Sequence, residues 1–242
     1  MEIAGSSAQA LIIGANGGIG AALVAELAAS HRYDRIIAAA RSKPDLLPAN
    51  VAYHPVDIAD PASIEAAATA IDAPLTRVIV ATGILHDEGG GPERSLRDLD
   101  ADRLAHLFAI NTIGPALALK HFAPLLAKDQ PSAIACISAR VGSISDNRLG
   151  GWYGYRASKA ALNQIVRTAA IELARSHRQA VCVALHPGTV DTGLSKPFQR
   201  GVPAEKLFTP EYSAGRLLAV LDGLTPAQTG RIFAWDGTEI AP

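Results

Sequence analysis

The feature of this sequence that most constrains its fold is the alternation of short apolar runs with longer amphipathic stretches. The short runs are continuously apolar, which is typical of parallel strands that are covered on both faces. Seven such strands are predicted, over Gln9–Ile13, Arg35–Ala40, Val51–His54, Arg77–Ala81, Ala133–Ile137, Ala180–Leu185 and Arg231–Ala234. Helices are predicted between them, over Ile19–Ser30, Pro61–Ile71, Leu99–Leu126, Tyr155–His177 and Pro210–Leu221. The pattern predicts an α/β fold: a doubly wound, mostly parallel seven-stranded sheet with helices on both faces.

Length and composition favour one globular domain over residues 1–242. With 242 residues, of which 49% are hydrophobic and 19% charged, the chain can bury a sizeable core. A formal charge of −1 does not supply the broad positive field that non-specific nucleic-acid binding needs. The uncharged stretch Ile3–Ala25 is too rich in glycine and polar residues for a membrane helix. Neither a nucleic acid nor a membrane is therefore expected as a partner.

The two cysteines and the N-terminal residues indicate the cellular compartment in which the protein is expected. Cys136 and Cys182 both fall within predicted strands and have no neighbouring His or Cys. We expect two reduced core residues, with neither a metal site nor a disulfide. The first residues lack the basic segment of a signal peptide. Together these features predict a cytoplasmic protein.

A glycine-rich turn joins the first predicted strand to the first predicted helix. Glycine tolerates positive φ and lets the backbone approach a diphosphate, and the new helix offers unpaired N–H groups to that anion. Glycines also serve ordinary tight turns, but the strand–turn–helix context favours a dinucleotide site of the Rossmann type. The predicted cofactor contacts in this turn are Gly14, Asn16, Gly18, Ile19 and Gly20.

The end of the second predicted strand indicates which nicotinamide cofactor is preferred. NAD-binding folds typically place an Asp or Glu here to hold the ribose 2′-hydroxyl. This chain has Arg41 and Ser42 instead, which can pair with a 2′-phosphate. A solvated arginine at a strand end is the alternative. We predict NADP(H) as the cofactor.

The pair Tyr155 and Lys159 predicts proton-transfer chemistry. Residues four apart lie on one helix face, one turn from each other. Free tyrosine has a pKa near 10, and an ammonium one turn away stabilises the phenolate and lowers that value. Tyr155 is therefore the predicted acid/base in the reduction of a carbonyl or the oxidation of an alcohol. Tyr153 lies six residues before Lys159 and does not fit this spacing.

Two further polar residues complete a recognisable set. Ser138 ends the fifth predicted strand, where its hydroxyl can bind a substrate carbonyl oxygen or simply cap a turn. Asn111 is a polar residue inside an otherwise apolar helical stretch. With Tyr155 and Lys159 they resemble the Ser-Tyr-Lys-Asn tetrad of the short-chain dehydrogenase/reductase family. The resemblance implies that Asn111 kinks its helix and holds a water that links the lysine to solvent. It also implies hydride transfer between NADP(H) and a small carbonyl or alcohol substrate.

The resemblance covers nearly the whole chain and implies further cofactor contacts and a substrate lid around residues 189–208. The additional contacts are Asp57 and Ile58 at the adenine, Gly83 beside its ribose, and Pro187, Gly188, Val190 and Thr192 towards the carboxamide and diphosphate. Tyr155 and Lys159 also contact the cofactor in this family. The chain departs from the family pattern where Ile13 replaces a Thr and where Ala81-Thr82-Gly83 replaces Asn-Ala-Gly. These changes remove one hydroxyl contact and one side-chain tie between strands.

The subgroup, the substrate and the oligomer are less constrained. Residues 142–161 and the tail 233–237 look closest to the C-factor-like subgroup, which is associated with intercellular signalling. An NADP(H)-binding signalling or sensor protein with little turnover is therefore an alternative. An extended epimerase shares the glycine turn and Tyr-x-x-x-Lys but usually carries an additional domain, and only about 83 residues follow Lys159. The family's dimer interfaces, formed by the two long helices, imply a homodimer or homotetramer.

The identity of the substrate stays open. The candidate pocket residues are Arg140, Arg148, Trp152, Tyr153, His186 and Phe198.

Overall fold

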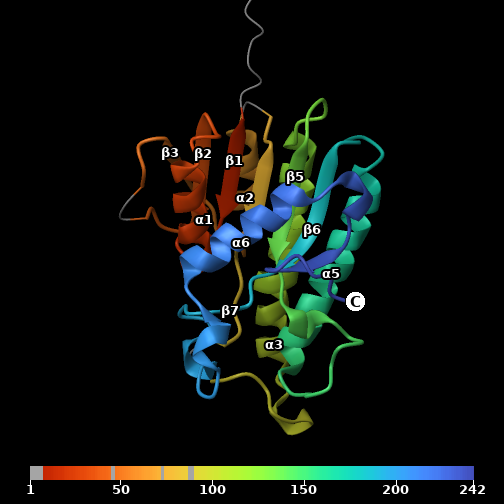
Figure 1. The fold of residues 1–242 in the computed structure, drawn as a ribbon. Coiled ribbons are helices and arrows are strands. Elements are labelled where there is room, and N and C mark those ends of the chain that lie inside the picture. Colours follow the sequence, from red (N-terminus) through yellow and green to blue (C-terminus); the bar gives the residue numbers. More distant parts are fainter. Residues whose placement is uncertain (1–7, 45–46, 72–73, 87–89) are drawn as a thin grey trace, which may run out of the picture.

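The computed structural model describes residues 8–44, 47–71, 74–86 and 90–242, and its centre is one seven-stranded sheet (Figure 1). All neighbouring strands of this sheet pair in parallel, in the order β3-β2-β1-β4-β5-β6-β9. The strands are β1 (Gln9–Ile13), β2 (Arg35–Ala40), β3 (Val51–Pro55), β4 (Arg77–Val80), β5 (Ser132–Ile137), β6 (Ala180–His186) and β9 (Ile232–Ala234). The predicted doubly wound α/β fold is thus confirmed, and strand bounds differ from the predictions by one residue at most.

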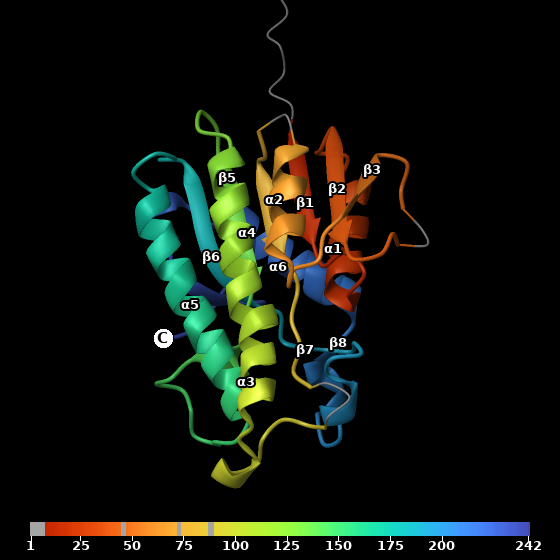
Figure 2. The ribbon, with the colours of Figure 1, turned by 180° about the vertical axis from the view of Figure 1, so that it is seen from behind.

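Helices cover both faces of the sheet. α1 (Gly18–Ala29) and α6 (Pro210–Gly223) lie on the face towards the viewer in Figure 1. α2 (Pro61–Thr69), α4 (Gly114–Phe122) and α5 (Tyr153–Leu173) lie on the other face, which Figure 2 turns to the front. Each face has its own hydrophobic core, because successive strand residues point to opposite sides of a sheet. Along β1, Leu11 and Ile13 belong to the core beneath α2, α4 and α5, whereas Ala10 and Ile12 belong to the core beneath α1 and α6.

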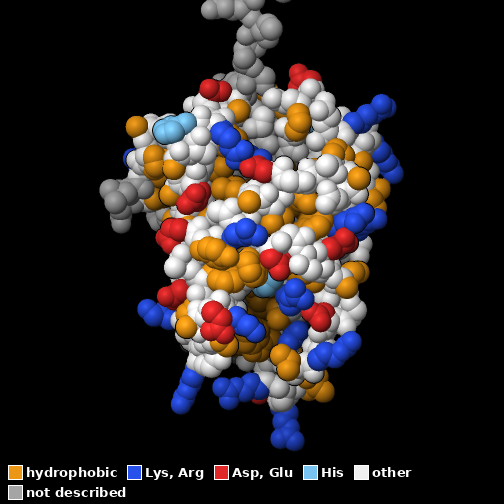
Figure 3. All heavy atoms as spheres, in the orientation of Figure 1, with side chains coloured by type: hydrophobic (Ala, Val, Ile, Leu, Met, Phe, Trp, Pro, Cys, Tyr) orange, Lys and Arg blue, Asp and Glu red, His pale blue; other side chains and the backbone are white. Residues whose placement is uncertain are grey.

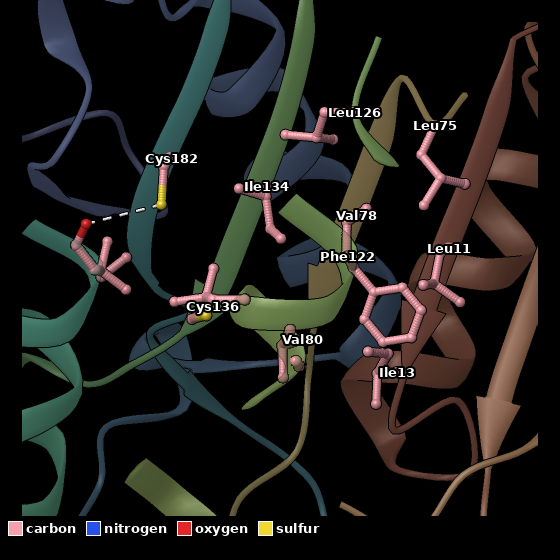
Figure 4. Packing of buried hydrophobic residues seen from close by; sticks show 14 of the residues in the cluster. Leu11, Ile13, Leu75, Val78, Val80, Phe122, Leu126, Ile134, Cys136 and Cys182 are labelled. Carbon is pink, nitrogen blue, oxygen red and sulfur yellow. Dashed lines mark hydrogen bonds between the residues drawn. The ribbon is translucent and has the colours of Figure 1, made fainter. Parts of the chain in front are cut away.

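Figure 4 shows the first of these cores, in which the ring of Phe122 lies over strands β1 and β4. Phe122 is fully buried. Cys136 and Cys182 are free, buried thiols in this region, and the Cys182 thiol contacts the carbonyl oxygen of Val166. Burial raises the pKa of Cys136 to about 12, so both cysteines behave as apolar core residues, as predicted.

Side-chain caps explain where three helices begin. The Asp60 carboxylate accepts a hydrogen bond from the backbone of Ala62, and Pro61 takes the first helical position of α2. Asp100 caps α3 (Ala101–Phe108) and Thr209 caps α6 in the same manner. The predicted helix from Leu99 consequently starts at Ala101.

The predicted single helix Leu99–Leu126 is interrupted in its middle. Between α3 and α4, residues 109–113 form one π-helical turn, and the N–H of Gly114 bonds to the carbonyl of Ala109. The sequence contains the cause. Pro115 has no N–H to donate to the carbonyl of Asn111 four residues earlier, so a regular α-helix cannot continue through this point.

The segment after β6 folds over the carboxyl end of the sheet. It contains the short parallel pair β7 (Thr189–Val190) and β8 (Leu207–Phe208), with two 3₁₀ turns between them. Among the described residues, no helix has the length and apolar character needed to cross a membrane.

Candidate active site

The carboxyl ends of β4, β5 and β6 and the start of α1 border a pocket of about 320 Å³. Ligands of open α/β sheets bind at this edge. Figure 3 shows a hollow with hydrophobic side chains below α6, between the segment 189–208 and the turn that precedes α5. The predicted site residues that line the pocket are Ile19, Gly83, Ser138, Tyr155, Lys159, Pro187, Gly188, Val190 and Thr192. The candidate substrate residues Arg140, Trp152, His186 and Phe198 line it as well, whereas Arg148 and Tyr153 do not.

The glycine turn is built around close backbone contacts. Gly14 has a φ of +91°, a conformation that favours glycine. A Cβ on Gly20 would overlap the Gly14 carbonyl, and one on Gly18 would lie 2.6 Å from a methyl carbon of Thr192. No side chain caps the start of α1 at Gly17. The turn therefore presents the uncapped N–H groups of α1 beside Thr192, which is the arrangement that binds a diphosphate.

The end of β2 is tied to this turn through Asn16. Its Nδ2 atom donates a hydrogen bond of 2.9 Å to the hydroxyl of Ser42. Arg41 lies exposed beside Ser42, within the part of the site where the sequence predicts the 2′-phosphate. Asp57 and Ile58 follow β3 at the same edge, where the Asp57 carboxylate accepts from the N–H of Ala59.

Tyr155 and Lys159 lie side by side in the first turns of α5 and are both buried. The Lys159 ammonium lies 5.8 Å from the centroid of the Tyr155 ring and donates a hydrogen bond of 2.9 Å to the carbonyl of Ile137. Burial raises the pKa of Tyr155 and lowers the pKa of Lys159 to about 8. The direction for Tyr155 is opposite to the predicted lowering, because burial dominates and the ammonium lies over the ring.

Asn111 is fully buried in the π-helical turn. Its Oδ1 atom accepts from the N–H of Ile84 at 2.9 Å, and its Nδ2 atom donates to the Ile84 carbonyl at 2.8 Å and to the Ser158 hydroxyl. These bonds fix the segment after β4 against α5. A Cβ on Gly83 would lie 3.3 Å from Asn111 Oδ1 and 3.4 Å from Lys159 Nζ, so Gly83 separates the two polar groups.

Ser138 contacts a residue that the sequence analysis did not single out. Its hydroxyl donates a hydrogen bond of 2.7 Å to Oδ1 of Asn163, and both side chains are buried. Asn163 is four residues after Lys159 and eight after Tyr155, so all three lie on one face of α5. This spacing of a polar residue within an apolar helix was the signal that could have identified it.

Glu93 is the second residue that was missed. It is buried, and its Oε2 atom accepts a hydrogen bond of 3.1 Å from the N–H of Gly154, in the first turn of α5. Trp152, at the start of α5, has a φ of +53° and supplies no side-chain cap. Glu93 thus caps from a distant segment the helix that carries Tyr155. Local sequence could not indicate this because 61 residues separate the partners.

His186 adds a polar group to the pocket wall. Burial, and next the charge of Arg140, lower its pKa to about 4, so the imidazole is neutral at pH 7. Arg140 forms an ion pair of 3.2 Å with Asp146, and both side chains are half-exposed. Two aromatic rings also contact each other in the pocket wall: Phe198 packs edge-on against Trp152, with ring centroids 5.4 Å apart.

Similarity to known proteins agrees with this geometry. The family model described as short chain dehydrogenase matches residues 8–202. The chain is 34% identical to 1-hydroxy-2-glutathionyl-2-methyl-3-butene dehydrogenase of Rhodococcus sp. (strain AD45), over 94% of this chain and 96% of that protein. It is 38% identical to C-signal of Myxococcus xanthus over 146 residues, which are 60% of this chain and 82% of that protein.

A solved structure agrees over nearly the full length. NADPH-bound carbonyl reductase from chicken fatty liver superimposes with a TM-score of 0.83 at 30% identity, over 97% of this chain and 98% of that protein. The predicted C-factor-like relationship is confirmed by the similarity to C-signal. With the family model matched over most of its length, this chain belongs to the short-chain dehydrogenase family of oxidoreductases, whose members bind a nicotinamide cofactor and act on small molecules.

Proposed function

We propose that this protein transfers a hydride between NADP(H) and a small carbonyl or alcohol substrate, with Tyr155 as the acid/base. The observation that carries the proposal is the joint burial of Tyr155, Lys159 and Ser138 around one pocket at the carboxyl edge of the sheet. The chicken carbonyl reductase, which holds NADPH in its crystal structure, supports the choice of cofactor.

The residues present fit a dinucleotide. The uncapped start of α1 and the glycine turn leave backbone N–H groups for the diphosphate. Arg41 is exposed where a 2′-phosphate would lie, and Gly83 leaves space between Asn111 and Lys159. Of the other predicted contacts, Asp57 and Ile58 would hold the adenine. Pro187, Gly188 and Val190 would lie at the carboxamide, and Thr192 at the diphosphate. When bound, the cofactor supplies or accepts the hydride.

The chain's own residues handle the proton and orient the substrate. Because burial raises the pKa of Tyr155, its phenol stays protonated at neutral pH and can donate to a carbonyl oxygen. Lys159 is one turn away and charged below about pH 8, so it favours the phenolate that remains after donation. Ser138 holds the carbonyl oxygen between its hydroxyl and that of Tyr155. In the oxidation direction Tyr155 takes the proton back.

We also propose that the chain works as one domain whose segment 189–208 closes over the substrate. This segment contributes Val190, Leu194, Phe198 and Val202 to the pocket wall. Apolar side chains there would exclude water from the reacting groups. Together with Trp152 they favour a substrate with an apolar body beside its carbonyl group.

A homodimer or homotetramer with α4 and α5 at its interface is the proposed assembly. These helices border a groove on the face opposite α1 and α6. Ile171 on α5 is half-exposed, as is Ile113 in the π-helical turn directly before α4. Burial of such a surface against a second copy is favourable. Light scattering at micromolar concentration should give at least twice the mass of one chain, and a monomer would contradict this assembly.

The central test is NADPH oxidation across a panel of aldehydes, ketones and diketones, with Tyr155→Phe alongside. Turnover by the wild type that is lost in Tyr155→Phe, with little change in NADPH affinity, supports the proposal. Full activity in Tyr155→Phe would exclude the mechanism. Saturable NADPH binding with no turnover on the whole panel would favour the signalling or sensor role, which the similarity to C-signal makes the second candidate.

A further inference from the structure

Only one of the two polar atoms of the Asn163 side chain has a hydrogen-bond partner among the described residues. Its Oδ1 atom accepts the Ser138 hydroxyl proton at 2.7 Å. Its Nδ2 atom is buried and has no hydrogen-bond partner among the described residues. A buried donor without a partner carries the full penalty of its desolvation. The present orientation of the Asn163 amide, which contacts Ser138, is therefore unfavourable.

The present hydrogen bond also directs the Ser138 proton away from the pocket. A hydroxyl has one proton and two lone pairs. While that proton is donated to Asn163, Ser138 can only accept a hydrogen bond from a ligand. A carbonyl oxygen has no proton to give, so Ser138 cannot hold a carbonyl substrate in this state.

A rotation of the Asn163 amide by about 180° frees the Ser138 proton and gives the Nδ2 donor a partner. Nδ2 then donates to the Ser138 oxygen, and the Ser138 proton is free to point into the pocket. The carbonyl oxygen of the amide moves to the position near Gly142, and an unpartnered carbonyl is less costly than an unpartnered N–H. Gly142 gives the amide its room, since a Cβ there would lie 3.0 Å from Nδ2 and 2.8 Å from Lys159 Cβ.

We infer that Asn163 is a positioning residue: by donating from Nδ2 to the Ser138 hydroxyl oxygen, it directs the Ser138 proton to the carbonyl oxygen of the substrate. The inference rests on the proposed carbonyl reduction. Asn163, the third residue of the row that Tyr155 and Lys159 begin on α5, thus sets the direction of the hydrogen bond made by Ser138, directly after β5.

Asn163→Asp and Asn163→Leu separate this role from a packing role. Both have the same number of side-chain heavy atoms as asparagine, with the same branch at Cγ. Aspartate as a carboxylate can only accept, so it holds the Ser138 proton permanently, and we expect kcat to fall about 100-fold at pH 8, as for loss of an oxyanion donor. Leucine leaves the Ser138 hydroxyl free to turn, and a fall of about tenfold is expected. If Asn163 served only in packing, Asn163→Asp would not lose more activity than Asn163→Leu.

The pH dependence of Asn163→Asp gives the decisive readout. When protonated, the introduced carboxyl becomes a donor and can replace Nδ2. The ratio of its kcat to that of the wild type should therefore rise at least about tenfold from pH 8 to pH 5, while the same ratio for Asn163→Leu stays flat. The titratable groups on the surrounding elements are Tyr155 and Lys159 on α5, Cys136 on β5, Arg140 after it, and Cys182 and His186 on β6. All are shared with the wild type. The introduced carboxylate raises the pKa of Lys159, which keeps the ammonium charged at pH 8, so this effect opposes the expected rise of the ratio at low pH and cannot imitate it.

The assay uses the full chain, NADPH and 1-phenyl-1,2-propanedione or the best carbonyl of the panel. Gln179→Glu, an exposed amide-to-acid change before β6, is the matched control and should keep wild-type kcat at both pH values. NADPH affinity should be unchanged in all variants. A flat ratio for Asn163→Asp, or a greater loss in Asn163→Leu, would overturn the inference while wild-type turnover still supported the proposed function.

A second readout needs no turnover. In the NADP⁺-bound protein, the side-chain amide signal of Asn163 in ¹H–¹⁵N spectra should move when Ser138 is replaced by alanine, because Nδ2 loses its acceptor. An unchanged signal would overturn the inference. Absence of wild-type turnover would count against the proposed function alone and leave this signal to decide the inference.

Discussion

The ammonium nitrogen of Lys159 donates a hydrogen bond of 2.9 Å to the carbonyl oxygen of Ile137, the last residue of β5. This bond joins α5 to the strand that leads into Ser138. It also leaves a positive charge in a buried position, since Lys159 is only 2% exposed. One carbonyl and the face of one aromatic ring replace the water that an exposed ammonium would have. The lowered pKa of Lys159 is the consequence.

The first prediction concerns stability against pH. The free energy of unfolding of the wild type should rise relative to that of Lys159→Met between pH 8 and pH 9.5. Folded Lys159 loses its proton near pH 8, whereas its ordinary pKa is 10.5. In this window the unfolded chain binds more protons, so rising pH favours the folded state. At about 1.4 kcal/mol per pH unit the difference should grow by roughly 2 kcal/mol.

Urea unfolding at the two pH values measures this difference. Burial raises the pKa values of Tyr155, Cys136 and Cys182, so these groups stay protonated in both folded proteins over this window and do not contribute to the difference. Lys206→Met, which removes an exposed ammonium, is the control and should show no growth with pH. A constant difference for Lys159→Met would mean that the buried lysine keeps an ordinary pKa.

The second prediction concerns the cofactor. Arg41→Ala should weaken NADPH binding about 10- to 150-fold, the range for one charge-assisted hydrogen bond. NADH has no 2′-phosphate, so its affinity should hardly change. Fluorescence titration with both cofactors tests this, with Arg178→Ala as a matched loss of one exposed arginine. Equal affinity of the wild type for both cofactors would contradict the NADP(H) preference.

The third prediction compares two glycines within helices. Gly20→Ala should destabilise the protein, because its Cβ would overlap the Gly14 carbonyl. In contrast, a Cβ on Gly215 of α6 would meet nothing within 4 Å, so Gly215→Ala should stabilise by roughly 0.5–1 kcal/mol. Thermal unfolding of the two variants measures both. A similar change in both variants would show that the contact at Gly14 is not what selects glycine at position 20.

The continuous apolar runs predicted the sheet well because their pattern has a single physical cause, burial of a strand on both faces. The glycine turn and the Tyr155–Lys159 pair could also be predicted from the sequence, since each depends on a fixed local spacing. Their convergence on one pocket follows from the parallel sheet, whose strand ends share an edge. The roles of the individual site residues stay predictions.

Other features depend on contacts between distant segments. Pro115 indicated locally that the predicted helix Leu99–Leu126 is interrupted. The π-helical form of the interruption also depends on the hydrogen bonds between Asn111 and Ile84, a distant segment. The upward pKa shift of Tyr155 required knowledge of burial, which no motif contains. The pairing of Ser138 with Asn163 spans 25 residues and two kinds of element, so spacing alone could not reveal it.

The last prediction concerns Glu93, whose carboxylate accepts from the N–H of Gly154 at the start of α5. Removing a helix cap costs about 0.5–2 kcal/mol, so Glu93→Ala should unfold at a lower urea concentration than the wild type. Because the first turn of α5 also carries Tyr155, the same variant should lose kcat while NADPH affinity, which depends on α1 and β2, is retained. Glu65→Ala on α2, an exposed position, is the matched control. A destabilised Glu93→Ala variant with wild-type kcat would show that the cap supports the fold without positioning Tyr155.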